Sequence, residues 1–256
     1  MKLSFLKKFK ISILNYKEYG LLNKSSFKSA LGYIFILCLI LGVLVSTKLA
    51  YEYKGFLNFI EAELNNSFPD FIFEKGILKV KQQDIIVLKN KENIDLIIDT
   101  ISKLDKNILT NYDKAVLIQK DKIFIKLNSN IDETRLDTFK KIKLNKNEFK
   151  KYIVKSNLGF LIIIIGFPFV FFMESIFLSF LIFLLGILVI SFLRVTILSK
   201  NIFKLSMYAS TTPIILNTIL MLFNYRNPKL NYIPIIIGLS YLFFSIKFIV
   251  TTKYED

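Results

Sequence analysis

The chain has 256 residues, of which 53% are hydrophobic, and its formal charge is +15. Its mean hydropathy of +0.48 is more than one soluble core of this size could hide, so the composition excludes a soluble protein and predicts an integral membrane protein. Because the chain has no histidine and one cysteine, imidazole or thiolate metal sites, an internal disulfide and histidine general-base catalysis are excluded as well.

Residues 1–29 form a basic leader that holds seven lysines and one acid. Phe5, Leu6, Phe9 and Ile13 recur at helical spacing with lysines between them, which predicts an amphipathic helix on the anionic inner lipid surface. The alternative is a solvated, charged tail that only orients the first membrane helix. Since cytoplasmic flanks are rich in lysine and arginine, we expect the amino terminus inside the cell.

Residues 30–50 are predicted to form the first membrane helix, because the apolar stretch from Ala30 to Thr47 is long enough to cross a bilayer. A cleaved signal peptide is the alternative. Lys48 lies where a small residue should precede the cleavage site, so we expect an uncleaved anchor. Cys38, inside this stretch, is expected to be a buried side chain at lipid depth.

Residues 51–155 are predicted to form a small β-rich domain outside the cell. The segments that predict its strands are FPDFIFEKGILKV (68–80) and AVLIQKDKIFIKL (115–127), each read as a hairpin, and the β-branched runs DIIVL (84–88) and IDLIID (94–99). The lysine-rich stretch 133–154 is helical in composition and is predicted to be a helix at the membrane surface.

Asp99 ends one of these strands, so its expected role is to cap a turn, and a catalytic role is the alternative. The sequence contains no glycine-rich phosphate loop, nucleophile elbow or metal-ligand spacing. We therefore expect no enzymatic activity, no catalytic residue, and no cofactor or metal.

An uncharged run from Asn157 to Leu193 is interrupted by one carboxylate, Glu174. A helix rises about 1.5 Å per residue and the apolar core of a bilayer is about 30 Å thick, so the run is nearly twice too long for one crossing. It predicts two helices that reverse at Met173-Glu174-Ser175, with Glu174 in water. The alternative is an intramembrane carboxylate that pairs with a cation or binds a proton or an ion.

Two further spans are predicted from Leu205 to Tyr225 and from Leu230 to Ile246. Residues 156–256 are therefore expected to form a four-helix transmembrane bundle. With the first span, the predicted fold class is an α-helical integral membrane protein with five transmembrane helices and a small β-rich (α+β) domain between helices 1 and 2. Arg194 and Lys247 end their spans and are expected to be interfacial anchors.

The predicted fourth span carries a polar face. Ser206, Ser210, Pro213 and Asn217 are spaced by four, three and four residues, so they lie on one side of a helix. Such a face could line a substrate path. Small hydroxyl and amide side chains are also the usual contacts between membrane helices, and we expect this helix-packing role.

Four segments stand out in the assembled pattern, namely NYKEY (15–19), FPDFIFEKGILKV (68–80), IIDT (97–100) and KLSMYASTTPIILN (204–217). With these segments, the chain resembles domain of unknown function family 1189 of low-GC Gram-positive bacteria over essentially its whole length. Some members are labelled maltodextrin-utilisation membrane proteins, and the four-helix end is similar to Yip1-type membrane proteins of trafficking. The resemblance implies an accessory role in the membrane and supplies no catalytic residues.

Two classes of function are consistent with these features. The first is a non-enzymatic accessory or scaffold protein of the bacterial cytoplasmic membrane, with anionic lipid headgroups and other membrane proteins as partners. The resemblance adds a link to sugar uptake. The alternative is a small transporter or channel that uses the polar face of the fourth span. Nucleic acid is excluded as a partner because no aromatic and basic module of the kind that reads bases occurs.

Overall fold

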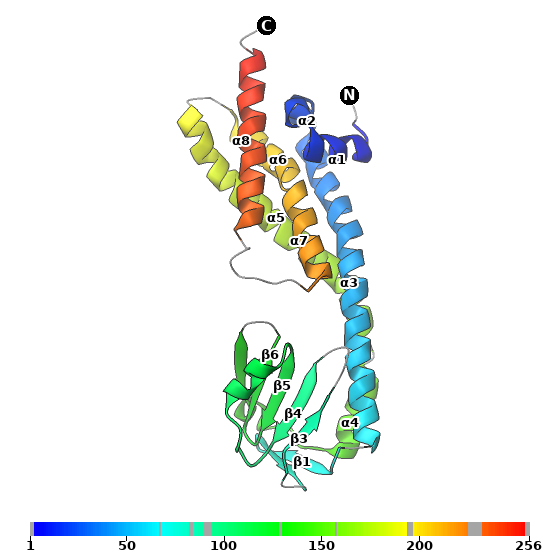
Figure 1. Ribbon diagram of the computed structural model, residues 1–256. Helices are drawn as coiled ribbons and strands as arrows, with labels where there is room; N and C mark the ends of the chain where they lie inside the picture. The colour runs from blue at the N-terminus through cyan, green and yellow to red at the C-terminus, as the bar shows by residue number, and fades with distance from the viewer. Residues whose placement is uncertain are drawn as a thin grey trace. The chain divides into compact units, whose positions relative to one another are not determined.

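The chain divides into two compact units, a helical unit of residues 1–48 and 162–256 and a β unit of residues 49–161 (Figure 1). The computed structural model describes residues 3–66, 68–81, 84–89, 94–127, 130–156, 158–193, 197–224 and 232–253. Arg194, predicted to be an anchor, lies outside the described residues, as do the predicted span ends at Tyr225 and Leu230.

The helical unit contains a leader of short helices followed by long apolar ones. Its elements are α1 (Phe5–Leu14), η1 (Tyr16–Glu18), α2 (Tyr19–Asn23), α3 (Phe27–Asn66), α5 (Gly159–Leu193), α6 (Ser199–Ala209), α7 (Thr211–Leu222) and α8 (Ile233–Lys253). Within the described residues, four helical stretches are long and apolar enough to cross a membrane, namely α3, α5, α6 with α7, and α8. The protein is thus a multi-pass membrane protein with four candidate spans, and the predicted count of five is wrong.

The error lies in α5, which is one continuous helix of 35 residues. No reversal occurs at Met173-Glu174-Ser175, and Glu174 lies near the middle of the helix. A hairpin between two helices needs a short loop with its own turn chemistry, and this stretch offers no glycine, asparagine or proline. A hydrophobic run longer than the bilayer is instead accommodated by tilt or by extension beyond the lipid.

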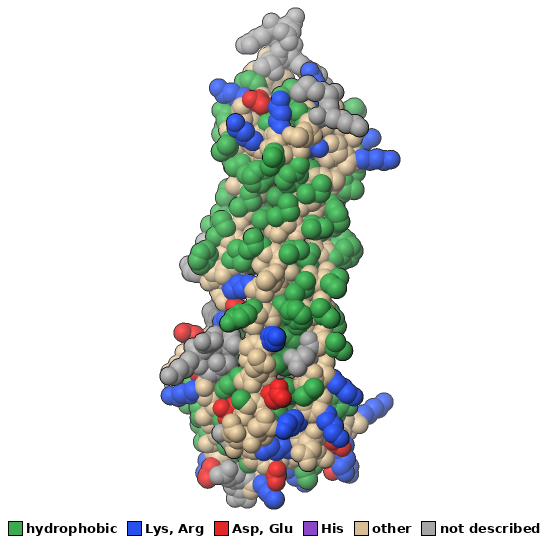
Figure 2. Space-filling model, turned by 90° about the vertical axis from the view of Figure 1, so that its right-hand side faces the viewer, with side chains coloured by type: hydrophobic (Ala, Val, Ile, Leu, Met, Phe, Trp, Pro, Cys, Tyr) green, Lys and Arg blue, Asp and Glu red, His purple; other side chains and the backbone are tan. Residues whose placement is uncertain are grey.

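The surface of the helical unit is apolar. Figure 2 shows hydrophobic side chains over much of its visible face, with charged side chains gathered at one end of it and over the β unit. Large exposed side chains on α5 include Ile162 and Leu188, which are 72% and 66% exposed. Since a soluble protein rarely leaves so many apolar side chains in water, this surface fits contact with lipid.

The leader packs against the helical unit. α1 forms as predicted, but the face that it buries is made by Lys8, Ile11 and Ser12, while Leu6 is 75% exposed. Tyr19 is fully buried in the same core. The leader is therefore neither a solvated tail nor a helix whose whole apolar face is free for lipid.

Among the described residues, the β unit holds two small sheets and three short helical segments. Its strands are β1 (Phe71–Glu74), β2 (Ile77–Val80), β3 (Ile86–Leu88), β4 (Asp95–Asp99), β5 (Ala115–Gln119), β6 (Lys122–Lys126), β7 (Ile131–Arg135) and β8 (Leu144–Asn145), with η2 (Lys106–Asn111), η3 (Leu136–Phe139) and α4 (Lys146–Ser156). The strand orders are β2-β1-β8 and β3-β4-β5-β6-β7, and among these described strands only β4 and β5 pair in parallel. Both predicted hairpins are confirmed as β1 with β2 and β5 with β6.

The predicted helix over residues 133–154 is only partly confirmed, because α4 begins at Lys146. A reciprocal cap sets this start. Asn145 Oδ1 accepts from the Glu148 backbone N–H at 2.9 Å, and Glu148 Oε2 accepts from the Asn145 N–H at 3.0 Å. The charged residues before it extend the larger sheet as β7.

The carboxy-terminal part of α3 belongs to the β unit. α3 continues past the predicted end at residue 50, and its residues Leu57, Ile60 and Leu64 share one face by their helical spacing. They are buried together with strand residues such as Phe73. Apolar residues at helical spacing therefore continue beyond residue 50, and this part of α3 packs against the strands of the β unit.

Asp99 caps a turn at the end of β4, as predicted. Its carboxylate is fully buried and accepts from the backbone N–H groups of Ile101 at 3.2 Å and Leu104 at 2.6 Å. Both oxygens are used in holding the chain after the strand, which is a structural role.

Candidate functional site

The polar face predicted in the sequence lies where α6 ends and α7 begins. Pro213 has no backbone N–H, so the carbonyl of Ala209 loses its helical partner, and the helix breaks at Ser210. Ser210 keeps a helical backbone with φ −75° and ψ −6°. The junction is thus a bend in one span, at which backbone and hydroxyl groups meet the neighbouring helices.

Hydroxyl groups connect this junction to three other segments. Ser210 Oγ lies 2.8 Å from Ser179 Oγ of α5, and Thr211 Oγ1 lies 3.0 Å from the Tyr33 hydroxyl of α3. Tyr208 Oη lies 3.1 Å from Ser25 Oγ, just before α3. We call these side chains the polar seam, and its members are Ser25, Tyr33, Ser179, Tyr208, Ser210 and Thr211.

The structure brings together three of the four predicted face residues. Ser206, Ser210 and Pro213 are buried, and Ser206 Oγ donates to the carbonyl of Ile202 at 2.9 Å. A β-carbon on Gly238 of α8 would lie 3.3 Å from Pro213 Cγ, so this ring packs on α8. Asn217 is half-buried and takes no part in the seam.

The partners of the face were not found by sequence reasoning. Ser179 and Tyr33 lie in apolar runs whose spacing gives no sign of which helix they meet. The nearest signal is the pair Ser175 and Ser179, four residues apart on one face of α5. This pair indicates a small polar stripe on α5, but it does not indicate which helix contacts the stripe.

The chemistry of the seam is that of neutral hydroxyl groups. It holds no carboxylate, no cation and no imidazole, and no group of three potential metal ligands occurs among the described residues. Hydrogen bonds of this kind contribute about 0.6 kcal/mol each between membrane helices. Such an arrangement holds helices together.

A buried lysine attaches the leader to α6. Lys204 is 5% exposed, and its Nζ donates to the carbonyls of Asn23 and Ser25, the latter at 2.9 Å, and to Asn201 Oδ1 at 3.2 Å. Asn23 is the last residue of α2. A cation there satisfies carbonyl groups that a helix end leaves without partners.

A second set of contacts holds α1 and η1. Lys8 Nζ donates to Ser29 Oγ at 2.6 Å, and burial lowers the pKa of Lys8. The Tyr19 hydroxyl donates to the Ser12 carbonyl at 2.9 Å, and burial raises the pKa of Tyr19 well above its ordinary value. The helical spacing of the leader predicted that its lysines face the lipid surface, whereas Lys8 is buried, as is Lys204 of α6.

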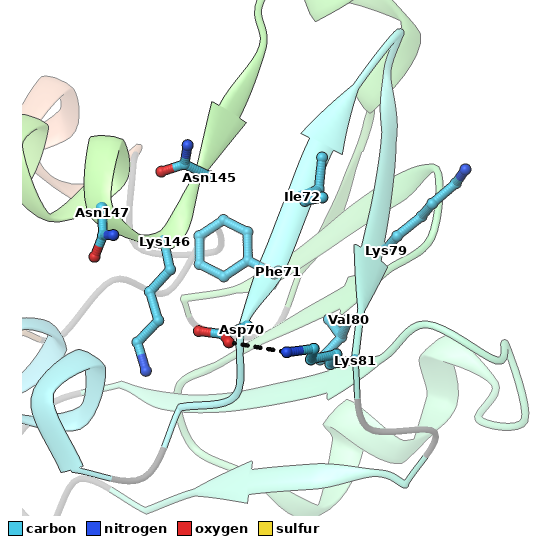
Figure 3. Close-up of a pocket in the computed structure, with 9 residues that line it drawn as sticks. All are labelled: Asp70, Phe71, Ile72, Lys79, Val80, Lys81, Asn145, Lys146 and Asn147. Atoms are coloured by element: carbon cyan, nitrogen blue, oxygen red, sulfur yellow. Dashed lines mark hydrogen bonds and ion pairs between the residues drawn. The ribbon is translucent and has the colours of Figure 1, made fainter.

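The β unit carries an open pocket of about 440 Å³ (Figure 3). It is lined by Asp70, Phe71, Ile72, Lys79, Val80, Lys81, Asn145, Lys146 and Asn147. Lys81 Nζ lies 3.4 Å from Asp70 Oδ2, Lys146 donates to the carbonyl of Phe68, and Figure 3 shows Lys79 directed away from this pair. Both partners of the ion pair are exposed, so it stabilises little, and the lysines do not converge on one position.

Comparison with known proteins gives one match. The family model described as "Protein of unknown function (DUF1189)" matches residues 6–246. Neither the curated proteins nor the solved structures contain a match. The matched range begins within α1, includes the whole β unit and ends within α8.

Proposed function

This chain belongs to the DUF1189 family, and we propose that it is a non-enzymatic accessory or scaffold protein of the bacterial cytoplasmic membrane. One observation carries the proposal. The side chains of the polar seam are buried except for the half-buried Ser25, and their hydroxyl groups lie within hydrogen-bond distance of one another or of backbone carbonyls. Since these side chains contact neighbouring helices, they support a packed bundle that presents its surfaces to partners. Anionic lipid and other membrane proteins are the proposed partners, and a link to sugar uptake is part of the proposal.

Four spans also support an orientation. With the amino terminus inside, α3 leads out, α5 returns, α6 with α7 leads out and α8 returns. Arg194, Lys200 and Lys204 then flank the inner side, in agreement with the positive-inside rule, whereas five spans would leave them outside. The β unit lies outside in this arrangement, because long segments are translocated largely regardless of their charge.

Cysteine labelling tests the orientation and the number of spans together. In a Cys38→Ala background, Lys120→Cys is expected to react with a membrane-impermeant maleimide in intact cells, because Lys120 is exposed in the β unit. Lys200→Cys is expected to react only after permeabilisation. Reaction of both variants in intact cells would support five spans, and the opposite pattern would reverse the orientation.

The bend at Ser210 favours transport as the second candidate function. Broken helices near the middle of the membrane are typical of transporters, and both α5 and the α6-α7 span contain proline. Against this stands the engagement of the Ser210 and Thr211 hydroxyl groups, whereas the buried Thr212 hydroxyl at the same bend has no hydrogen-bond partner among the described residues. A transport path needs polar groups that face a substrate, and only Asn217 on the predicted face is half-buried.

Alanine variants separate the two functions. Ser210→Ala removes the contact with Ser179, so we expect a loss of about 1 kcal/mol in the free energy of unfolding in detergent. Asn217→Ala is the matched control on the same face and should change this free energy by about 0.5 kcal/mol or less. Purified protein in vesicles is expected to show no uptake of labelled maltose or other small sugars. Saturable uptake that Asn217→Ala abolishes would replace the scaffold proposal by the transporter.

A further inference from the structure

We infer that Glu174 binds a lysine or arginine on a membrane helix of a partner protein, within the apolar layer of the bilayer. The inference rests on the proposed scaffold function and specifies the chemistry of its partner. It begins from the failed sequence prediction, because a carboxylate that does not lie in a turn must be accommodated by another means.

The depth of Glu174 follows from the contacts between α3 and α5. A β-carbon on Gly42 would lie 2.8 Å from Pro168 Cα, and the rings of Phe35 and Phe172 lie 5.3 Å apart. The two helices are therefore antiparallel, and Glu174 lies beside the part of α3 just before Cys38.

A lysine lies at each end of the apolar run of α3. Lys28 and Lys48 are the nearest charged residues on either side of its apolar run. At 1.5 Å per residue, Glu174 lies about 10 Å or more from the level of each of them. The carboxylate is consequently inside the apolar layer, and its short side chain does not reach either boundary as a lysine could.

The Glu174 side chain lies on the outer face of α5. It is exposed, and so are Val170, Met173 and Phe177, which are 52%, 53% and 63% exposed. In the part of the chain that the structure describes, Glu174 makes no hydrogen bond or ion pair. Gly166 lies two turns earlier, and a β-carbon there would contact nothing within 4 Å. The same side of α5 thus carries a carboxylate, at Glu174, and a residue without a side chain, at Gly166.

Lipid alone does not account for this combination. Charged side chains at the middle of a bilayer are rare, and they normally face a protein interior and pair with another group. A small residue on a membrane helix allows a second backbone to approach closely. A partner helix could pack closely against α5 at Gly166. A lysine or arginine on that helix would lie beside Glu174 and complement its charge.

A second copy of the chain fits less well. A symmetric pair of α5 helices would bring two Glu174 side chains together, and like charges repel. The two cations that flank the apolar run of α3, Lys28 and Lys48, lie about 10 Å or more from the level of Glu174, and Lys48 donates to the carbonyl of Met221 and to Asn224 Oδ1. A basic helix of another membrane protein therefore remains the proposed occupant.

A charge swap with synthetic helices tests the inference. Full-length protein is reconstituted in vesicles of phosphatidylethanolamine and phosphatidylglycerol with a labelled leucine-alanine transmembrane peptide that carries a central lysine. Peptides with a central leucine or glutamate serve as comparisons, and binding is measured by energy transfer. The unmodified protein is expected to bind the lysine peptide about tenfold more tightly than the leucine peptide.

Variants of the protein complete the swap. Glu174→Leu should remove the preference for lysine, and Glu174→Lys should transfer it to the glutamate peptide. Phe177→Gln, at an equally exposed position, should keep the original preference, and circular dichroism verifies that each variant is folded. Equal binding of all peptides by the unmodified protein would overturn the inference, as would an unchanged preference in Glu174→Leu.

Two further outcomes are informative. Disulfide formation between Val170→Cys chains in the absence of peptide would indicate a second copy as the occupant and overturn the basic partner. Failure of the charge swap without any sugar uptake would overturn only the partner's chemistry, whereas saturable uptake would overturn the scaffold function itself.

Discussion

Replacing Gly42 with leucine is expected to lower the free energy of unfolding of the helical unit by about 3 kcal/mol. A β-carbon at this position would lie 2.8 Å from Pro168 Cα and 3.1 Å from Pro168 Cβ. Contacts between carbon atoms are favourable at about 3.5–4.0 Å, so the two helices would have to separate. Because the obstacle is backbone and a proline ring, no change of rotamer relieves it.

The matched control for this prediction lies on the same helix. A β-carbon at Gly32 would meet nothing within 4 Å, so Gly32→Leu adds the same side chain to an open face. Both variants gain the same helix propensity, since leucine replaces glycine in each. Thermal unfolding in detergent, followed by circular dichroism, measures the difference. Equal midpoints for the two variants would show that the α3-α5 contact at Pro168 is not close.

The β unit was largely predictable because its signals are local. Alternating apolar residues around Glu74-Lys75-Gly76 and around Lys120-Asp121 predicted two hairpins, and both form. Asp99 likewise follows a local rule, since its cap uses N–H groups only two and five residues further along the chain. The start of α4 escaped notice because composition favoured a helix earlier, whereas the pairing of β7 with β6 decides the outcome.

The helical unit was less predictable because its decisive contacts join residues far apart in the sequence. Ser210 meets Ser179, and Tyr33 meets Thr211, across intervals that no periodic pattern encodes. Glu174 was placed in a turn because the run from Asn157 to Leu193 is nearly twice too long for one straight crossing of the bilayer. The continuous α5 shows that the helix keeps its backbone hydrogen bonds and places the carboxylate on its outer face instead.

Replacing Gly76 with alanine is expected to destabilise the β unit by about 2–3 kcal/mol. The residue has φ +77°, a region that favours glycine, and a β-carbon there would lie 2.8 Å from Asp137 Cα and 2.9 Å from the Leu136 carbonyl oxygen. The turn between β1 and β2 is therefore pressed against η3, and the larger residue strains both. Hydrogen exchange of residues 68–81 should accelerate roughly 30-fold to 150-fold if opening follows this free energy.

A substitution at the neighbouring residue, Lys75, is expected to stabilise the hairpin. It therefore serves as a control for unspecific effects of changing the turn. Lys75 also has positive φ, at +55°, although it carries a side chain. Two consecutive residues with positive φ define the hairpin turn that prefers Asn-Gly, so Lys75→Asn should stabilise the hairpin by about 0.5 kcal/mol and slow the same exchange. If Lys75→Asn accelerated exchange as Gly76→Ala does, contacts of the lysine side chain would outweigh backbone conformation in this turn. Opposite signs at adjacent positions would exclude an unspecific effect of changing the turn, because both substitutions change the same hairpin.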